Sequence, residues 1–372
     1  MKQRLSILIF CVTILLAGVS LGACSQEKKE RPPIDASEVI LGHLKDSYSW
    51  HFFTVGDKHV EIPLPIIVRS KERGWFVFLS NHLNHAPEYK GFYYATEGIS
   101  AGKVVEKNAA GQEVRPFDIS ISKNVLALFI SCGLLCWLIL SLSHWYKKRE
   151  KEGNPDAVPT GLLGFMELFI MDINDSVIKK CIGKDYKRYA PYLLTAFFFI
   201  FFNNIMGLIP LFPGGANLTG NIAVTFTMAL ATFVAVNVFG NKEYWKDVLW
   251  PDVPIFLKAL PIMPIIEIFG LFTKPMALMV RLFANIFAGH CIILALTCLV
   301  FLTAAMGPVV NGSMSAVSVL FSLFMLCLEL LVAYIQAYVF TMLSAVFIGM
   351  SRQEHAHKET KQHNSEQQIA TK

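Results

Sequence analysis

The sequence is short of charge. Of its 372 residues only 16% are Asp, Glu, Lys or Arg, whereas 54% are hydrophobic. Soluble globular domains usually carry about 25% charged residues, so this composition excludes an ordinary soluble protein and favours a chain embedded in lipid. The net charge of +5 is small, and the basic residues stand in clusters between apolar runs. That placement argues against a nucleic-acid partner.

The chain also lacks the spacings that bind metals, close disulfides or hold nucleotides. Six of its eight cysteines lie in apolar stretches, and none has the polar setting of a zinc site or a disulfide framework. A metal site at His82 and His85 is conceivable, but structural or solvated histidines are the better interpretation, because no carboxylate or cysteine stands at matching spacing. No P-loop glycine motif occurs. We therefore expect no cofactor, no metal and no nucleotide chemistry on this chain.

The amino terminus has the pattern of an export signal over residues 1–23. Two basic residues precede an apolar stretch, and small residues lead up to Cys24, as before a cleavage site. The same residues resemble a lipobox, so simple cleavage after Ala23 and lipidation of Cys24 both stay open. In either case residues 24–123 are predicted to be an exported, periplasmic domain.

This exported domain is predicted to contain β-strands. Residues 60–68 and 75–79 are strand-like runs rich in β-branched and aromatic residues. Gly56, Gly74 and Gly91 mark turns between such runs.

Apolar stretches dominate the rest of the chain. Residues 124–143 form one predicted membrane span, residues 191–240 form two that proline and glycine divide, and residues 259–350 form the last two. Each is long enough to cross a bilayer as a helix. The predicted fold class is an all-α polytopic membrane protein with about five crossing helices over residues 124–350, plus the small exported β-containing domain.

The last two predicted helices are too long for an upright crossing. Residues 265–303 would make a helix of roughly 58 Å, and residues 317–350 one of roughly 51 Å, at a rise of 1.5 Å per residue. A bilayer core is about 30 Å thick. We therefore expect both helices to be strongly tilted, because bilayer thickening cannot absorb so large a mismatch.

The distribution of basic residues predicts the orientation. Lysine and arginine occur in stretches 144–189 and 241–258 and in the tail at 351–372, but not in the connections around 213–221 and 304–316. By the positive-inside rule the tail is cytoplasmic and the amino terminus lies outside. Five crossings agree with that parity.

Four charged residues interrupt the last apolar region, namely Glu267, Lys274, Arg281 and Glu329. The first three are seven residues apart and share one stripe of a helix. An arginine in lipid costs at least about 2.5–3.5 kcal/mol, so Arg281 is either paired internally or kept for function. A buried ion pair with Glu329 is one interpretation. The favoured one is a charge that faces a water path or a partner's carboxylate, since the small residues that follow Arg281 would let another helix approach.

His290 completes a candidate proton relay. It stands nine residues after Arg281, near the opposite side of the helix, and so cannot share that residue's role. Packing with a satisfied hydrogen bond is the default for a lone histidine. Glu329 on the neighbouring helix makes proton exchange the favoured interpretation, because histidine titrates near neutral pH. Asn285 continues the stripe of Arg281, and Gln336 shares a face with Glu329.

Two runs of residues resemble a known family. Residues 267–290 read EIFGLFTKPMALMVRLFANIFAGH, and residues 329–343 read ELLVAYIQAYVFTML. The first resembles the arginine helix of the F-type ATP synthase a subunit, which is highly specific, and the second resembles that family's last helix. Weaker similarities agree in order and position, over roughly residues 124–355.

The resemblance implies a non-catalytic subunit that gives protons two half-channels to the carboxylates of a c-subunit ring. It implies partnership with that ring, with b subunits and with the rest of the synthase, in a bacterial inner membrane. Arg281 would separate the half-channels. His290 and Glu329 would form the relay of the outer one, where many members carry the acid and the histidine in exchanged places.

The resemblance also assigns the remaining polar positions. Asn285 and Gln336 match residues that line the outer path, and Glu267 matches an acidic residue toward the cytoplasmic exit. Lys274, between Glu267 and Arg281 on the same stripe, is a further candidate for proton translocation. The exported domain is not required by the family core.

Two other functions compete with this interpretation. An ion-coupled secondary transporter would show internal repeats and interrupted helices in both halves, whereas only one half of this chain carries charges in its apolar region. A membrane-anchored sensor would leave Arg281, His290 and Glu329 unexplained.

Overall fold

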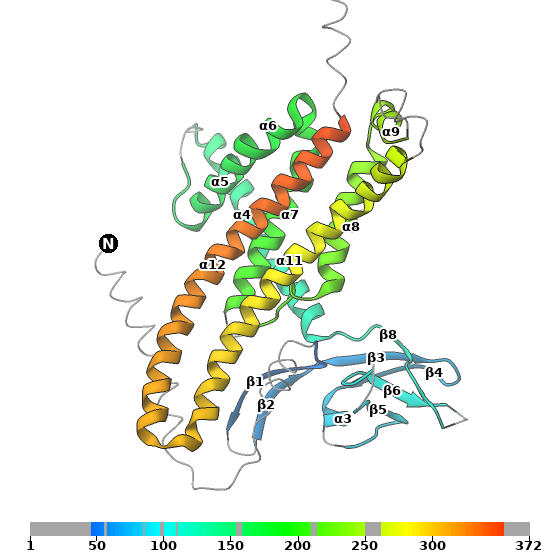
Figure 1. The fold of residues 1–372 in the computed structure, drawn as a ribbon, viewed down its shortest axis with the longest axis vertical. Coiled ribbons are helices and arrows are strands. Elements are labelled where there is room, and N and C mark those ends of the chain that lie inside the picture. Colours follow the sequence, from blue (N-terminus) through cyan, green and yellow to red (C-terminus); the bar gives the residue numbers. More distant parts are fainter. Residues whose placement is uncertain are drawn as a thin grey trace, which may run out of the picture. The chain divides into compact units, whose positions relative to one another are not determined.

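The computed structural model describes a β-containing region followed by a helical region (Figure 1). The described residues are 46–55, 58–84, 86–96, 100–108, 111–153, 158–209, 214–249 and 262–352. The predicted signal sequence, Cys24, His85 and most of the tail lie outside them.

Eight short strands form the amino-terminal β region, because alternating residues of these runs are apolar and turn inward. In β3, for example, Ile66, Val68 and Ser70 are buried while their neighbours are not. The elements of this region are β1 (Ser49–Val55), β2 (Lys58–Pro63), β3 (Pro65–Ser70), β4 (Gly74–Leu79), α3 (Asn81–Asn84), β5 (Phe92–Tyr94), β6 (Val104–Lys107), β7 (Glu113–Val114) and β8 (Phe117–Asp118).

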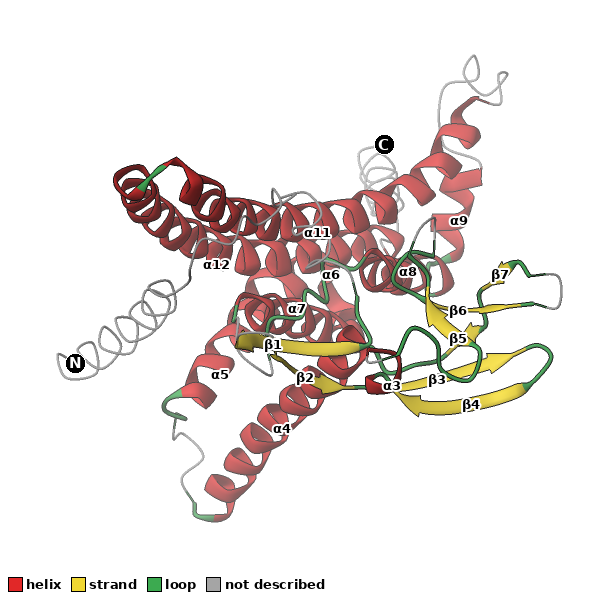
Figure 2. Ribbon diagram, turned by 90° about the horizontal axis from the view of Figure 1, so that it is seen from below, coloured by secondary structure: helices red, strands yellow, loops and turns green. Residues whose placement is uncertain are grey.

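The strands pair into a β1–β2 hairpin and two three-stranded antiparallel sheets, ordered β4-β3-β8 and β5-β6-β7 (Figures 1 and 2). One hydrophobic core joins the two larger sheets, with Ile66, Phe78, Phe92 and Val104 among its buried members. The predicted strand at 75–79 is confirmed. The run at 60–68 is two strands, since the Leu64 amide bonds to the Ser80 hydroxyl and the Tyr48 carbonyl instead of continuing a ladder.

The helical region confirms the polytopic fold class. Four described helices are long and apolar enough to cross a membrane, namely α4, α7, α11 and α12, and α8 is a shorter apolar helix. The helical elements are α4 (Lys123–Lys151), α5 (Leu162–Asp172), a π-helical turn (Ile173–Ile178), α6 (Lys179–Ile182), a 3-10 turn (Gly183–Asp185), α7 (Tyr186–Leu208), α8 (Ile222–Val238), α9 (Lys242–Leu249), α11 (Ile262–Thr303) and α12 (Pro308–Arg352).

The basic stretch at 144–189 was predicted as a connection, and that prediction is wrong for most of it. Helices and turns run from Leu162 to Asp185. Met166, Ile173 and Val177 from this segment are buried in the same core as α7 and α12. The lysines of this stretch indicate the topology of the chain, whereas its apolar residues, which recur at helical spacing, specify how the segment packs. Similarly, the predicted loop at 241–258 contains α9.

Helices α11 and α12 form a long antiparallel hairpin that both views show side by side (Figures 1 and 2). With 42 and 45 residues, they are roughly 63 and 68 Å long. The connection is shorter than the predicted loop at 304–316, because α12 already begins at Pro308. Proline suits a first helical position, and Gly307 with φ +106° makes the reversal before it.

Polar side chains tie the hairpin together along its length. Near its closed end the Thr303 hydroxyl donates to the Asn311 side chain at 3.3 Å. Further along, the Ser318 hydroxyl donates to the Leu296 carbonyl. Two more side-chain contacts between α11 and α12 lie further from the closed end, and both join candidate residues named from the sequence.

Candidate functional site

The centre of the hairpin holds a histidine–carboxylate pair. His290 Nδ1 of α11 lies 2.5 Å from Glu329 Oε1 of α12. The side chain of Glu329 is 4% exposed and that of His290 16%, so the pair is shielded from the surroundings. Within the described part of the chain the second carboxylate oxygen, Oε2, is buried without a hydrogen-bond partner. An unpaired buried carboxylate oxygen is costly.

Glycines make room for this pair. A Cβ on Gly289 would stand 3.0 Å from Glu329 Oε1 and 3.1 Å from its Cδ, closer than ordinary packing. On the other side, a Cβ on Gly207 of α7 would be 3.6 Å from His290 Nε2. The imidazole therefore lies between α7 and Glu329, and both helices approach it because side chains are missing there.

Gly289→Ala is expected to break the contact between His290 and Glu329 while leaving the hairpin folded. The added methyl group must push the Glu329 carboxylate out of line with His290. Nitrogen-15 NMR of the His290 imidazole measures the effect, because the Nδ1 resonance changes when the bond to Oε1 is lost. Gly270→Ala is the matched control in the same helix, because a Cβ there meets nothing within 4 Å. Equal His290 resonances in the two variants would contradict a tight fit at Gly289.

A second polar tie continues from the pair. The Asn285 amide donates to Gln336 Oε1 at 2.8 Å, and Gln336 is buried. These are the two residues that the sequence analysis placed beside Arg281 and Glu329. The sequence predicts the contact of His290 with Glu329 and not that of Asn285 with Gln336. We call these two contacts between α11 and α12 the polar track.

Polar residues of α7 and of the segment before α8 lie next to α12, and the sequence analysis did not assign them a role. Asn204 of α7 is buried, donates to the Ala333 carbonyl at 3.5 Å and accepts a bond from the Thr219 hydroxyl at 2.6 Å. Asn204 belongs to an apolar helix and forms an Asn-Asn pair with Asn203. That pair is the available sequence signal, since buried amides need partners. Nothing in the sequence alone predicts the contact with Thr219.

Arg281 points away from the chain's own core. The residue is exposed, whereas Leu278 and Leu282 on either side of it in the helix are buried. Among the described residues none forms an ion pair or hydrogen bond with it. The alternative of a buried pair with Glu329 is therefore wrong, because that carboxylate is bound to His290. An unsatisfied guanidinium on an apolar helix indicates a partner outside this chain.

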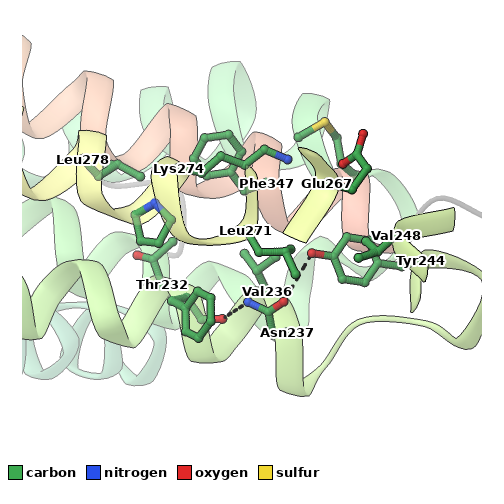
Figure 3. A pocket seen from close by; sticks show the side chains of 13 residues that line it. Thr232, Val236, Asn237, Tyr244, Val248, Glu267, Leu271, Lys274, Leu278 and Phe347 are labelled. Carbon is green, nitrogen blue, oxygen red and sulfur yellow. Dashed lines mark hydrogen bonds between the residues drawn. The ribbon is translucent and has the colours of Figure 1, made fainter. Parts of the chain in front are cut away.

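Glu267 and Lys274 line a separate cavity of about 490 Å³, formed by α8, α9, α11 and α12 (Figure 3). Tyr244 of α9 donates to Asn237 Oδ1 at 3.3 Å across this cavity, and the Asn237 amide donates to the Phe233 carbonyl at 2.8 Å. The Lys274 ammonium lies 5.8 Å from the centre of the Phe347 ring, a favourable cation–π contact.

The cavity is both charged and polar. Burial, and secondly the charge of Glu267, raise the pKa of the Tyr244 phenol, which keeps it a neutral donor at physiological pH. Glu267 and Lys274 share the cavity but form no ion pair among the described residues. Both stay available to water or ions that enter. Sequence reasoning selected the two charged residues and missed Tyr244, which comes from a helix it did not predict.

The described residues hold no group of three or more His, Cys, Asp or Glu that could bind a metal ion. His82 instead lies 3.3 Å from the Leu79 carbonyl and stacks near Tyr89, with 4.6 Å between ring centres.

Comparison with known proteins matches most of the chain. The family model described as "ATP synthase A chain" matches residues 125–349, and a domain of unknown function (DUF8433) matches residues 39–123. A protein of Chloroherpeton thalassium named ATP synthase subunit a is 40% identical over 246 residues, which are 64% of this chain and 68% of that protein.

Two further relatives carry the same name. That of Chlorobium phaeobacteroides is 41% identical over 251 residues, covering 65% of this chain and 69% of the relative. That of Myxococcus xanthus is 40% identical over 240 residues, covering 63% and 73%. None of these matches favours a secondary transporter. With a family model across its whole helical region and relatives at this identity, the chain belongs to the ATP synthase A chain family.

Proposed function

We propose that the chain is the proton-translocating subunit a of an ATP synthase, with two polar paths that meet a ring of c subunits at Arg281. The observation that carries the proposal is the buried pair of His290 on α11 and Glu329 on α12 at 2.5 Å, nine residues along α11 from Arg281, which has no ion pair among the described residues. Family membership supports the assignment. Nucleotide chemistry belongs to other subunits, so the chain itself is not an enzyme.

The outer path runs along the polar track. A proton that reaches Glu329 can pass to His290, because an imidazole takes up and releases protons near neutral pH and the two groups are already in contact. The unpartnered Oε2 of Glu329 is the acceptor for an incoming proton from water. Asn285 and Gln336, joined at 2.8 Å, add a second pair of polar groups to this path.

A carboxylate of the c-subunit ring binds the proton and moves with the ring. Once it is protonated, a carboxyl group is neutral and enters lipid at far lower cost than the ion. As that group returns to Arg281, the guanidinium favours its ionised form through proximity of opposite charge. Arg281 is exposed on α11, as this encounter requires. Its positive charge also repels protons that would cross directly from one path to the other.

The inner path is the cavity of Glu267, Lys274 and Tyr244. Glu267 receives the released proton, and the neutral Tyr244 phenol and Asn237 amide offer hydrogen bonds to water. In the proposed orientation this cavity opens to the cytoplasm of a bacterium, the β region lies in the periplasm, and the carboxyl-terminal tail is cytoplasmic. The basic residues of α6 and α9 support that orientation.

Glu267→Gln is expected to slow ATP-driven acidification of inverted vesicles several-fold, because an amide cannot accept the leaving proton. Glu150→Gln, an exposed change at the end of α4 far from the cavity in sequence, is the control and should pump normally. Dye quenching on addition of ATP gives the rates. Unchanged pumping by the Glu267 variant would remove the cavity from the path. A secondary transporter would leave this ATP-driven signal untouched by either change.

A further inference from the structure

One face of the β4-β3-β8 sheet is apolar and uncovered. Its inward face supplies the core of the β region through Ile66, Val68 and Phe78. The residues that alternate with these buried ones point to the opposite face of the sheet. On that face, the side chains of β4, of β8 and of the residue after β8 are exposed. We call the following set the apolar sheet face: Trp75 at 54% exposure, Val77 at 64%, Leu79 at 46%, Phe117 at 63% and Ile119 at 53%.

The pairing of the three strands places the side chains of the apolar sheet face next to one another. Arg69 of the central strand pairs with Trp75 on one side and with Phe117 on the other. The rings of Trp75 and Phe117 are 6.5 Å apart, and the Arg69 guanidinium lies 5.7 Å from the Trp75 ring. Ile67 pairs with Val77, and its carbonyl accepts the Ile119 amide. Three large side chains of β4, Phe117 of β8 and Ile119 just after it therefore form one surface on either side of the middle strand.

A short link connects the apolar sheet face to a membrane-crossing helix. Strand β8 ends at Asp118 and the membrane-crossing helix α4 begins at Lys123. Five residue steps span at most roughly 17 Å even when fully extended. Contacts fix the junction, since the Asn124 amide donates to Asp46 at 3.1 Å and Trp50 packs in a buried cluster with Ala127. The apolar sheet face is thus held within reach of lipid.

The chemistry of the face suits a bilayer surface. Trp and Phe are favoured where hydrocarbon meets headgroups, and exposed apolar patches of this kind mark interaction sites. Basic residues surround the aromatic end, namely Arg69, Lys71 and Arg115, with Glu72 as an acidic neighbour in the same turn. Cations at that position can meet lipid phosphates.

We propose that the apolar sheet face docks on the surface of the membrane that α4 crosses, with Trp75, Val77 and Phe117 inserted among the lipid headgroups. In the proposed orientation this is the outer leaflet. The β region is then seated on the bilayer beside the hairpin instead of projecting from it. This docking does not depend on proton transfer.

Photo-crosslinking in the assembled complex tests the docking. The photoreactive amino acid p-benzoylphenylalanine replaces Val77, whose exposure means that the core is not disturbed. The same group at Gln112, an exposed position next to β7 in the other sheet, is the matched control. Native membranes are irradiated, and mass spectrometry identifies what is attached.

We expect several-fold more phospholipid adduct at position 77 than at position 112. An adduct at position 77 with another protein, or with a segment of this chain, would overturn the proposal and name the true occupant. Equal lipid adducts at the two positions would overturn it as well, because simple nearness to the membrane would then explain both.

Discussion

Arg281→Ala is expected to abolish ATP-driven proton pumping in inverted membrane vesicles. The guanidinium is exposed, and no described residue of the chain pairs with it, so in the proposed function its partner is the carboxylate that passes on the ring. Without the positive charge nothing favours ionisation of that carboxylate at the inner path. The proton stays bound and net transport stops.

The same substitution is expected to make the membrane leakier to protons. In the proposed function Arg281 separates the polar track from the cavity, and one charge that crosses at 100 mV dissipates about 2.3 kcal/mol. Proton flux through complexes without ATP measures this leak. Val280→Ala changes an exposed neighbour on the same helix and serves as the control for assembly. Normal pumping by the Arg281 variant, with the complex intact, would refute the gate.

Exchange of the relay partners should restore function that either single change removes. His290→Glu and Glu329→His alone each leave two like groups facing across a gap of 2.5 Å. Loss of a positioned proton-transfer group costs about 100-fold, so each single variant should pump at a small fraction of the parent rate. The double variant again has one imidazole and one carboxylate, and we expect a substantial part of the parent rate.

The comparison of three variants separates chemistry from packing. Pumping rates of the two singles and the double, at equal amounts of assembled complex, form a double-mutant cycle. A double variant that is no better than the worse single would show that geometry at Gly289 and Gly207, not the identity of the pair, sets the rate. Singles with parent-like rates would exclude the relay altogether.

The charged residues of the helices were predictable because lipid makes charge expensive. Arg281, Glu267 and Glu329 stand out in an apolar region, and the cost of burying them implies a function. His290 and Glu329 are 39 residues apart, and the antiparallel hairpin of two long helices brings them into contact. The spacing rules placed Arg281 and His290 on different sides of α11, as the structure has them.

Other parts of the site depend on contacts that periodicity does not encode. Tyr244 reaches the cavity from α9, an amphipathic helix of eight residues, where the lysines of the sequence predict a cytoplasmic loop. The bond from Thr219 to Asn204 joins a segment before α8 to the last turns of α7. Such pairings follow from how the helices pack, and a local pattern carries no information about them.

The side-chain contacts across the hairpin determine how α11 resists a sideways load. In the proposed function a ring that turns past Arg281 pushes α11 sideways, so α11 must be braced by α12. The braces are the bonds already described at four levels, which are Thr303 with Asn311, Ser318 with Leu296, His290 with Glu329, and Asn285 with Gln336. Three of the four involve groups that never titrate. Most of the shear stiffness of the hairpin is therefore kept when a proton enters or leaves the relay, and only the contact between His290 and Glu329 changes with it.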